Sequence, residues 1–469
     1  MKNSFDTICA IATPLSAGGV GIIRVSGEKS LEIVQKFFSR KIVPNVINHG
    51  WIVNDGANID EVVVLYFKNP KSFTGEDVVE VQTHGSPIVI KEVLNLLLCA
   101  GVRLAERGEF TKRAFLNHKI DMTQAEAVLD LICAKTQKAA HLSANNLSGF
   151  LKQEINKIRV EIIEILAKII ASLDFPDDVA EVSNSDIENA LTNSIFRIEN
   201  ILKNANTHNI LREGAKVAIV GQPNVGKSSL FNALLSLQRA IVTDIAGTTR
   251  DIIAETLDVN GIAVTIIDTA GIREDESMDL VEQIGISNAK ETLAQADLAL
   301  CLYDGLKGLC EKDESIFKLC PDRVQKLIVS TKADLAGREA TRNALCEDFV
   351  EKFEPAIIQE ADISAHGEHL NVSAVTLYGI EELKRAIFDK IIGLNQTELE
   401  FSTNQRQQEC LRKGKAALEN ALSEARLGQL HDLISIDIKS ALLALDEITG
   451  ELVTEEILTH VFERFCIGK

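Results

Sequence analysis

The chain has 469 residues, of which 46% are apolar and 25% are charged, and it is too long for a single hydrophobic core. Its net charge of −19 argues against strong autonomous binding of RNA, because RNA is usually held on a basic face. No apolar run reaches the roughly 18–20 residues that span a bilayer, and the first residues lack a signal pattern, so we expect a cytoplasmic protein with no membrane span.

Residues 1–118 are predicted to form a small α+β domain. Glycine-containing turns separate short apolar runs, which predict strands at 8–12, 21–25, 61–67 and 78–82. A helical pattern follows at 87–99.

Residues 119–212 are predicted to be the first part of a helical domain. An apolar stripe with spacings of three and four residues predicts a long helix and comprises Ile155, Ile158, Ile162, Leu166, Ile169 and Leu173. Pro176 should end this helix. From 381 to 469 the pattern is helical again, and Thr454, followed by two glutamates, predicts the start of a last helix.

Residues 213–380 alternate between strand and helix patterns. The predicted strands are 216–220, 263–267, 298–303 and 327–330, each followed by polar loops and helical segments. This alternation predicts a doubly wound, mostly parallel sheet with helices on both faces. We therefore expect a multidomain α/β plus all-α protein, in which an α/β nucleotide domain is inserted in a helical domain.

The segment 221–228, Gly-Gln-Pro-Asn-Val-Gly-Lys-Ser, follows a predicted strand and precedes a predicted helix, which is the context of a P-loop. Backbone N–H groups of this loop would approach the β-phosphate, Lys227 would reach the β- and γ-phosphates, and Ser228 would ligate Mg²⁺. A chance glycine-rich turn is the alternative, but it leaves the agreement of strand, loop, Lys-Ser and helix unexplained.

Two further motifs predict the γ-phosphate and Mg²⁺ contacts. Asp268 and the residues Thr269-Ala270-Gly271 follow a strand, where the carboxylate could support Mg²⁺ and the Gly271 N–H could sense the γ-phosphate. The segment 247–251, Gly-Thr-Thr-Arg-Asp, lies where a switch loop belongs. Its Thr249 is the expected second Mg²⁺ hydroxyl.

The motif Thr331-Lys332-Ala333-Asp334 predicts guanine as the base. Asp334 can accept hydrogen bonds from the N1–H and 2-amino groups of guanine, which adenine does not offer, and Ser373-Ala374 would close the far side of the base. GTPases usually carry Asn at the position of Thr331, where it braces the base site against the P-loop. We therefore expect weaker nucleotide affinity with guanine specificity retained.

The water-orienting Gln of Ras-like enzymes has no counterpart, because Ile272 occupies its place. Asn224 and the oxygens of Thr243, Ile245 and Thr248 are hard ligands suited to a monovalent cation, which could stand where an arginine finger acts. Arg250 is a rival finger, and a switch salt bridge is an equally good interpretation of that residue.

The complete predicted GTP-binding set joins these motifs. It consists of Asn224, Val225, Gly226, Lys227, Ser228, Ser229, Thr243, Asp244, Ile245, Ala246, Gly247, Thr248, Thr249, Asp268, Thr269, Ala270, Gly271, Thr331, Lys332, Asp334, Ser373 and Ala374.

The flanking regions resemble the MnmE (also called TrmE) family of tRNA-modification GTPases. The resemblance rests on the segments 7–14, 18–27, 108–117 and 124–127 and on the terminal Cys466-Ile467-Gly468-Lys469. It covers essentially the whole chain. It implies a folate-binding N-terminal domain that forms a homodimer, and a GTPase domain inserted in a helical one.

The resemblance also implies partners and chemistry. An FAD-containing flavoprotein of the MnmG (GidA) type would join the homodimer in a heterotetramer. Together they would add a (carboxymethyl)aminomethyl group to C5 of the wobble uridine of certain tRNAs, with 5-formyl- or methylene-tetrahydrofolate as the one-carbon donor. GTP hydrolysis would depend on Mg²⁺, held by Ser228 and Thr249, and on K⁺.

Residue roles carried over by the resemblance complete the expected sites. The K⁺ ligands would be Asn224, Thr243, Ile245 and Thr248, and the catalytic residues Glu282, Lys227 and Thr249, with Glu282 orienting water through a bridging water. Folate would bind to Arg24, Glu80, Lys119 and Lys469. A carboxylate such as Glu80 can pair with the N–H and amino edge of a pterin, and the cations suit its glutamate tail. Cys466 is expected to position rather than to attack, because no His lies near it in the sequence.

Two other classes of function compete with tRNA modification. A ribosome-assembly GTPase is compatible with the P-loop and switch motifs, but it predicts a basic RNA-binding module after the GTPase domain, where this chain has acidic helices. A septin-like structural GTPase leaves the N-terminal domain unexplained.

Overall fold

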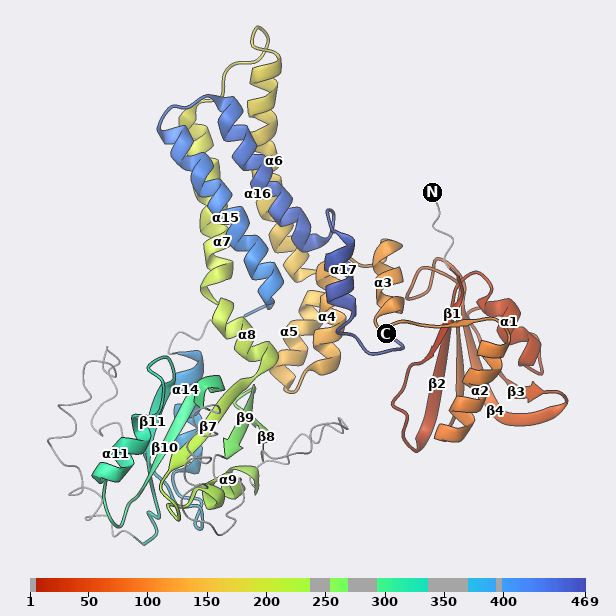
Figure 1. Ribbon diagram of the computed structural model, residues 1–469. Coiled ribbons are helices and arrows are strands. Elements are labelled where there is room, and N and C mark those ends of the chain that lie inside the picture. The colour runs from red at the N-terminus through yellow and green to blue at the C-terminus, as the bar shows by residue number, and fades with distance from the viewer. Residues whose placement is uncertain (1–5, 237–253, 269–292, 336–369, 394–398) are drawn as a thin grey trace. The chain divides into compact units, whose positions relative to one another are not determined.

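The computed structural model describes residues 6–236, 254–268, 293–335, 370–393 and 399–469 (Figure 1). The chain forms two compact units. The first comprises residues 1–132, 144–202 and 406–469, and the second comprises 133–143 and 203–405. No helix among the described residues is both long enough and apolar enough to cross a membrane.

The first unit contains a six-stranded sheet with the order β3-β4-β5-β2-β1-β6. Its strands are β1 (Ile8–Ile11), β2 (Gly18–Ser26), β3 (Ile47–Asn54), β4 (Ala57–Phe67), β5 (Val78–Gly85) and β6 (Arg103–Leu104). All pairs are antiparallel except β1 with β6. Helices α1 (Ser30–Phe37) and α2 (Pro87–Cys99) pack on it through a core that includes Ile23, Val64 and Val81. The α+β prediction and the helix at 87–99 are confirmed.

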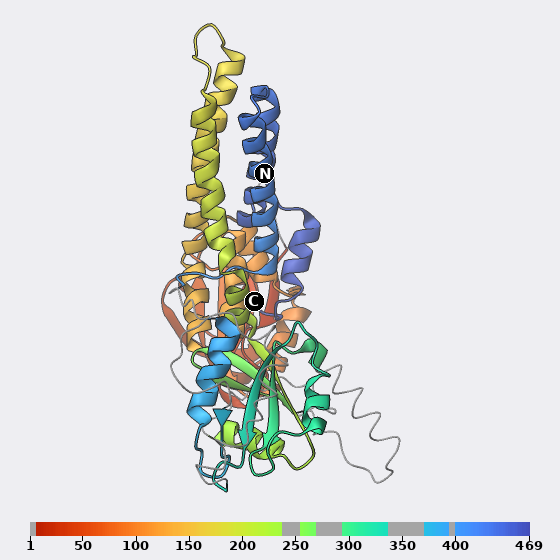
Figure 2. The ribbon, with the colours of Figure 1, turned by 90° about the vertical axis from the view of Figure 1, so that its left-hand side faces the viewer.

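The rest of the first unit is helical. It comprises α3 (Glu109–Leu116), α4 (Met122–Cys133), α6 (Phe150–Asp174), α7 (Asn184–Lys203), α15 (Gln405–Arg426), α16 (His431–Thr449) and α17 (Glu455–Phe462). Both ribbon views show α6, α7, α15 and α16 running side by side as a bundle (Figures 1 and 2). The predicted stripe of α6 is buried from Ile155 to Ile169, whereas Leu173, near the helix end, is 39% exposed. Thr454 caps α17, as predicted, by accepting a hydrogen bond from the Ile457 N–H.

The second unit is a doubly wound sheet with the order β12-β11-β10-β7-β9-β8. Its strands are β7 (Ala215–Gly221), β8 (Ala254–Val259), β9 (Ile262–Asp268), β10 (Leu298–Asp304), β11 (Gln325–Thr331) and β12 (Leu370–Asn371). Only the β8–β9 pair is antiparallel. Its described helices are α8 (Ala205–Glu213), α9 (Lys227–Ser236), α11 (Glu311–Phe317) and α14 (Ile380–Ile392), and α5 (Gln137–Leu147) contains the boundary at 143.

Both faces of this sheet are buried, which is why β7 reads as a continuous apolar run. Val217 and Ile219 pack on one face with residues of α9 and α14, whereas Ala218 and Val220 pack on the other with Phe317 of α11. The mostly parallel, two-faced sheet predicted from the sequence is confirmed. Helix α14 shares the sheet's core, so the second unit continues beyond the boundary expected at 380.

Candidate functional site

The P-loop joins the carboxyl end of β7 to α9. Asn224 has a left-handed backbone (φ 60°), which Asn tolerates better than most residues, and Gly226 has φ 105°. A side chain at Gly221 would lie 2.6 Å from the carbonyl oxygen of Leu302, so the loop passes too close to β10 for any other residue. The Lys227 Nζ donates to the carbonyl oxygens of Gly221 (2.9 Å) and Gln222 (2.8 Å), which turns the ammonium back over the loop.

The Thr331 motif lies at the carboxyl end of β11, on the same edge of the sheet. Open parallel sheets bind ligands at this edge. The buried Thr331 hydroxyl lies 2.6 Å from the Val225 carbonyl oxygen, to which it can donate, and 3.1 Å from that of Tyr303. The Thr331 hydroxyl thus links the base-reading motif to the P-loop. GTPases usually make this link with an Asn at the same position.

Asp334 and Ser373 meet at the predicted base position. The Ser373 hydroxyl donates to Asp334 Oδ1 (2.7 Å), and the Ala333 N–H donates to the Val372 carbonyl oxygen (3.1 Å). Asp334 itself is exposed, whereas Ser373 is buried and Ala374 is half-buried. The carboxylate is therefore held in place from behind and remains accessible from the solvent side.

Lys332 pairs with Asp304 at the end of β10. Its Nζ lies 2.7 Å from Asp304 Oδ2. Burial alone would raise the pKa of Asp304, but the hydrogen bonds from Lys332 and from the Leu306 N–H outweigh it and hold that pKa below its usual value. The Asp304 carboxylate is therefore charged and holds the Lys332 ammonium at the end of β10.

Much of the predicted nucleotide set lies outside the described residues. These residues are Thr243, Asp244, Ile245, Ala246, Gly247, Thr248, Thr249, Arg250, Thr269, Ala270, Gly271, Ile272 and Glu282. Asp268 ends β9 beside Ile219 of β7, and only its backbone is described. Ser228 and Ser229 are exposed in the first turn of α9. The structure thus brings together the P-loop and the base-reading residues of this set.

A second cluster surrounds Arg24 in the first unit. The antiparallel register of β2 and β5 places Arg24 opposite Glu80, and Arg24 Nε donates to Glu80 Oε1 (2.8 Å). The guanidinium carbon lies 5.7 Å from the ring centre of Phe73 and 5.6 Å from that of Phe110. Such distances are typical of cation–π contacts. The cluster combines a carboxylate, a guanidinium and two aromatic rings.

The end of the chain reaches the same cluster. Arg24 Nη1 donates to the Gly468 carbonyl oxygen (3.4 Å), and Ile467 forms a β-bridge with Arg107. Gly468 has φ 99°, and a side chain there would overlap the carbonyl oxygen of Ile11. Burial, and then repulsion by Arg24, lower the pKa of Lys469, and Glu80 opposes this effect. Arg24, Glu80 and Lys469 therefore share one electrostatic environment.

Lys119 contacts the loop that carries Phe73. Its Nζ donates to the Pro70 carbonyl oxygen (3.0 Å), and its side chain borders Gly75. Ser26 holds this loop through hydrogen bonds to Thr74 and Glu76, both 2.7 Å. Lys119 is therefore connected to the Arg24 cluster through its contacts with the loop that carries Phe73. Cys466 is exposed, with its carbonyl oxygen 3.4 Å from the Gly108 nitrogen.

Four residues that contact the predicted ones, or contact one another beside them, were not predicted from the sequence. Phe73 lies in a loop with no aromatic pattern, and Phe110 is one apolar residue within the predicted 108–117 segment. Gln222 is a position that the P-loop pattern leaves open, and Asp313, which is only 3% exposed, lies outside every predicted motif. No sequence signal distinguishes these residues from ordinary core or surface positions.

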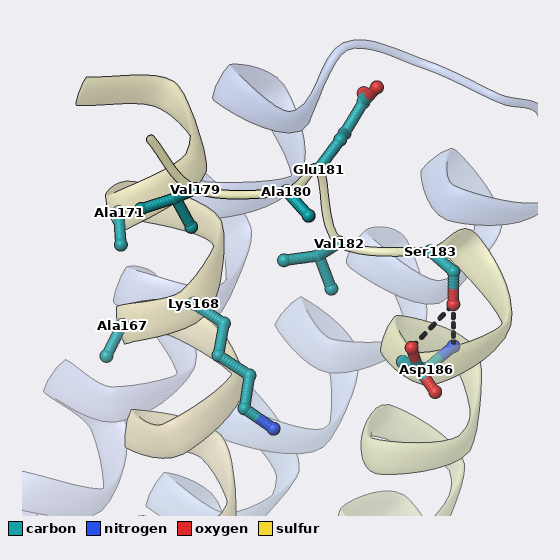
Figure 3. Close-up of a pocket in the computed structure, with 9 residues that line it drawn as sticks. All are labelled: Ala167, Lys168, Ala171, Val179, Ala180, Glu181, Val182, Ser183 and Asp186. Carbon is teal, nitrogen blue, oxygen red and sulfur yellow. Dashed lines mark hydrogen bonds between the residues drawn. The ribbon is translucent and has the colours of Figure 1, made fainter. Parts of the chain in front are cut away.

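A cavity of about 490 Å³ lies elsewhere in the first unit, between the end of α6 and the segment that leads into α7 (Figure 3). Its apolar lining consists of Ala167, Ala171, Val179, Ala180 and Val182. Its polar lining is Lys168, Glu181, Ser183 and Asp186, and Ser183 bonds to Asp186 rather than into the space. These side chains do not converge on a common point, so we assign no chemistry to this cavity.

Comparison with known proteins identifies the family. The MnmE helical domain matches residues 122–466, and the GTP-binding protein TrmE N-terminus matches residues 7–119. The tRNA modification GTPase MnmE of Thermotoga petrophila is 41% identical over 467 residues, covering 99% of this chain and 100% of the relative. That of Streptococcus mutans is 40% identical over 475 residues, with 100% of both chains covered. The crystal structure of Aquifex aeolicus Era bound to GDP and AlF4⁻ is 27% identical, with 43% of this chain and 66% of that chain covered and a TM-score of 0.30. The chain belongs to the MnmE family of tRNA modification GTPases.

Proposed function

We propose that this chain binds Mg²⁺–GTP at the carboxyl ends of β7, β9 and β11 and hydrolyses it. Lys227 would hold the β- and γ-phosphates, Ser228 and Thr249 would ligate Mg²⁺, and Asp334 would pair with guanine. The observation that carries this proposal is the Thr331 hydroxyl, 2.6 Å from the Val225 carbonyl oxygen. Through it, the phosphate-binding loop and the base-reading motif support each other as parts of one site.

Hydrolysis would use K⁺, because hydrophobic Ile272 cannot orient water. Asn224, Thr243, Ile245 and Thr248 would supply the oxygen ligands, and Glu282 would orient the attacking water through a second water. Asn224 supports this role because it is exposed at the loop, where it has a left-handed backbone. K⁺, when bound, would supply positive charge beside the phosphates.

The GTPase rate in K⁺ and in Na⁺ tests this part of the proposal. We expect hydrolysis at least about tenfold faster in K⁺, with the difference lost in Asn224→Ala and the rate strongly reduced in Glu282→Ala. Asn232→Ala is the matched control, since Asn232 is an exposed asparagine on α9 outside the loop. Equal rates in the two salts, or full K⁺ activation in Asn224→Ala, would refute the cation role.

The Arg24 cluster would bind the tetrahydrofolate, which supplies the one-carbon unit when bound. A pterin needs a planar acceptor for its N–H and amino edge and an aromatic face, and the glutamate tail needs cations. Glu80 could accept from the N–H and amino edge, Phe73 and Phe110 offer aromatic faces, and Lys119 and Lys469 offer cations for the tail. We expect Arg24→Met to weaken 5-formyl-tetrahydrofolate binding by at least about tenfold in calorimetry. Arg40→Met, at an exposed arginine of the same domain, should bind normally; equal affinities in the two variants would refute this site.

The whole reaction would take place in a cytoplasmic complex with an FAD-containing MnmG-type partner. A homodimer of this chain would join the partner in a heterotetramer that modifies C5 of the wobble uridine. The net charge of −19 suggests that the partner supplies much of the grip on tRNA. Mass spectrometry of tRNA nucleosides from cells that lack this protein should find this modification missing, and a full complement would refute the proposal.

A further inference from the structure

The start of helix α11 contacts the P-loop. Gln222, the second residue of the loop, points its side-chain amide at this helix and donates to Asp313 Oδ1 (2.7 Å) and to Cys310 Sγ (3.1 Å). Asp313 is a carboxylate that is only 3% exposed. Burying a charge is costly unless it is hydrogen-bonded, so each donor to this carboxylate counts.

The same carboxylate also caps α11. Asp313 Oδ2 accepts from the Cys310 backbone N–H and from the Cys310 thiol, both at 3.1 Å. The two oxygens therefore serve different structures, with one holding the helix start and the other holding the P-loop. Hydrogen bonds to an ionised acceptor are stronger than neutral ones.

The segment that leads into α11 also contacts the base-reading motif. The Gly305 N–H donates to the Thr331 carbonyl oxygen (3.1 Å), and Asp304 pairs with Lys332. The segment 304–313 thus touches the base-reading motif at one end and the P-loop at the other. Together with the Thr331–Val225 contact, this segment links the P-loop, the start of α11 and the base-reading motif to one another.

We propose that Asp313, acting through the Gln222 side chain, is a positioning residue that holds the P-loop in its nucleotide-binding shape. The proposal rests on the nucleotide site proposed above and adds a residue that no P-loop or guanine motif contains. Asp313 does not reach the nucleotide. Asp313 would act on the P-loop, whose N–H groups and Lys227 would hold the phosphates. We therefore expect Asp313 to affect the rate of nucleotide dissociation.

Dissociation of a fluorescent guanine nucleotide from the full chain, followed by stopped flow, tests this role. Gln222→Ala should speed dissociation by about fivefold and lower the melting temperature only slightly, because Asp313 loses one donor but keeps its bonds to the helix start. Gln222→Glu should speed it more, by about tenfold, because two carboxylates would then face each other. Adding Asp313→Asn to Gln222→Glu reverses donor and acceptor, and should return the rate to within about twofold of the wild type.

The exchange of donor and acceptor separates positioning from a merely structural role. Glu311→Ala is the matched control, because Glu311 is an exposed acid in the same first turn of α11, and its rate should equal that of the wild type. Wild-type rates in both Gln222 variants would overturn the proposal, and so would a failure of Asp313→Asn to relieve Gln222→Glu. In either case the wild type would still bind guanine nucleotide, whereas a wild type that binds none would overturn the nucleotide site itself.

Discussion

The nucleotide region and the Arg24 cluster are built in opposite ways. The P-loop is one contiguous segment between a strand and a helix, and the base-reading motif follows a strand two positions away in the same sheet. The Arg24 cluster instead joins β2, β5, a loop and the last residues of the chain, and Arg24 and Gly468 are 444 residues apart. The P-loop can be recognised from a short segment of sequence. The Arg24 cluster forms only when distant segments of the first unit fold together. A substitution in one region should therefore impair that region's site and leave the other site intact.

Lys227→Ala should have the largest effect, and only on the nucleotide side. Removing the cation that reaches the phosphates should lower the GTPase rate by at least about 100-fold, which a phosphate-release assay measures. Binding of 5-formyl-tetrahydrofolate should be unchanged. Lys216→Ala, at an exposed lysine of β7 before the loop, is the control, and an equal loss in both variants would contradict the role of Lys227.

As the pH falls, the second unit, which holds the nucleotide site, should lose stability at a higher pH than the first unit. Burial lowers the pKa of His208 from 6.5 to about 4, so the unfolded chain takes up the proton first. Stability is then lost as the pH falls from 6.5 to about 4, by about 3 kcal/mol in total. In the first unit, hydrogen bonds from Arg103 lower the pKa of Asp6 to about 2, so this ion pair persists through that window.

The chain's single tryptophan makes the comparison measurable. Trp51 lies in β3 and reports the first unit, whereas circular dichroism follows both units. In urea at pH 5 we expect circular dichroism to change before Trp51 fluorescence. His208→Gln should remove this acid-dependent gap, and His460→Gln, at an exposed histidine of α17, should keep it. Coincident transitions at pH 7 and pH 5 in the wild type would contradict this prediction.

Gly468→Ala should damage only the Arg24 cluster. Its left-handed backbone and the nearby Ile11 carbonyl leave no room for a side chain, so the last residues must move away from Arg24. We expect folate binding to weaken by about tenfold and the GTPase rate to stay unchanged. Gly428→Ala has a similar positive φ and no atom within 4 Å of the added carbon, so it controls for backbone strain alone.

Thr331→Val should have the smallest effect. Valine has nearly the same shape but cannot donate to the Val225 carbonyl oxygen, so nucleotide dissociation should become about fivefold faster. Ser330→Ala, at the neighbouring buried hydroxyl, provides the control. An unchanged rate in Thr331→Val would show that this hydroxyl does not brace the loop.

Strands with apolar residues at their buried positions could be predicted from the sequence, and others could not. β7 is apolar on both faces, so its pattern is unmistakable. β3 escaped prediction because two of its buried positions hold Asn48 and Gly50, where Gly50 makes room for the Phe38 ring. Asn48 is satisfied by backbone carbonyls, including that of Val64. Such compensation depends on the partner strand and cannot be seen in the strand itself.

The sites divide in the same way. The P-loop and Asp334 could be placed because their chemistry is encoded in adjacent residues. The pairing of Arg24 with Glu80 depends on strand register, and the contacts of Thr331 and Gln222 depend on how closely neighbouring strands and α11 approach the loop. Residue type alone predicts a weaker brace at Thr331 than at the usual Asn, and nucleotide affinity stays a prediction. The short distance to Val225 is a tertiary property.

We expect both regions to serve one modification of tRNA. Cells that lack the protein should be complemented in parallel with the wild type, Lys227→Ala, Gly468→Ala and Gly428→Ala, and their tRNA nucleosides quantified by mass spectrometry. The wild type and Gly428→Ala should restore the C5-modified wobble uridine, whereas Lys227→Ala and Gly468→Ala should each leave it strongly reduced. Full modification with Lys227→Ala or with Gly468→Ala, at normal protein levels, would contradict this expectation.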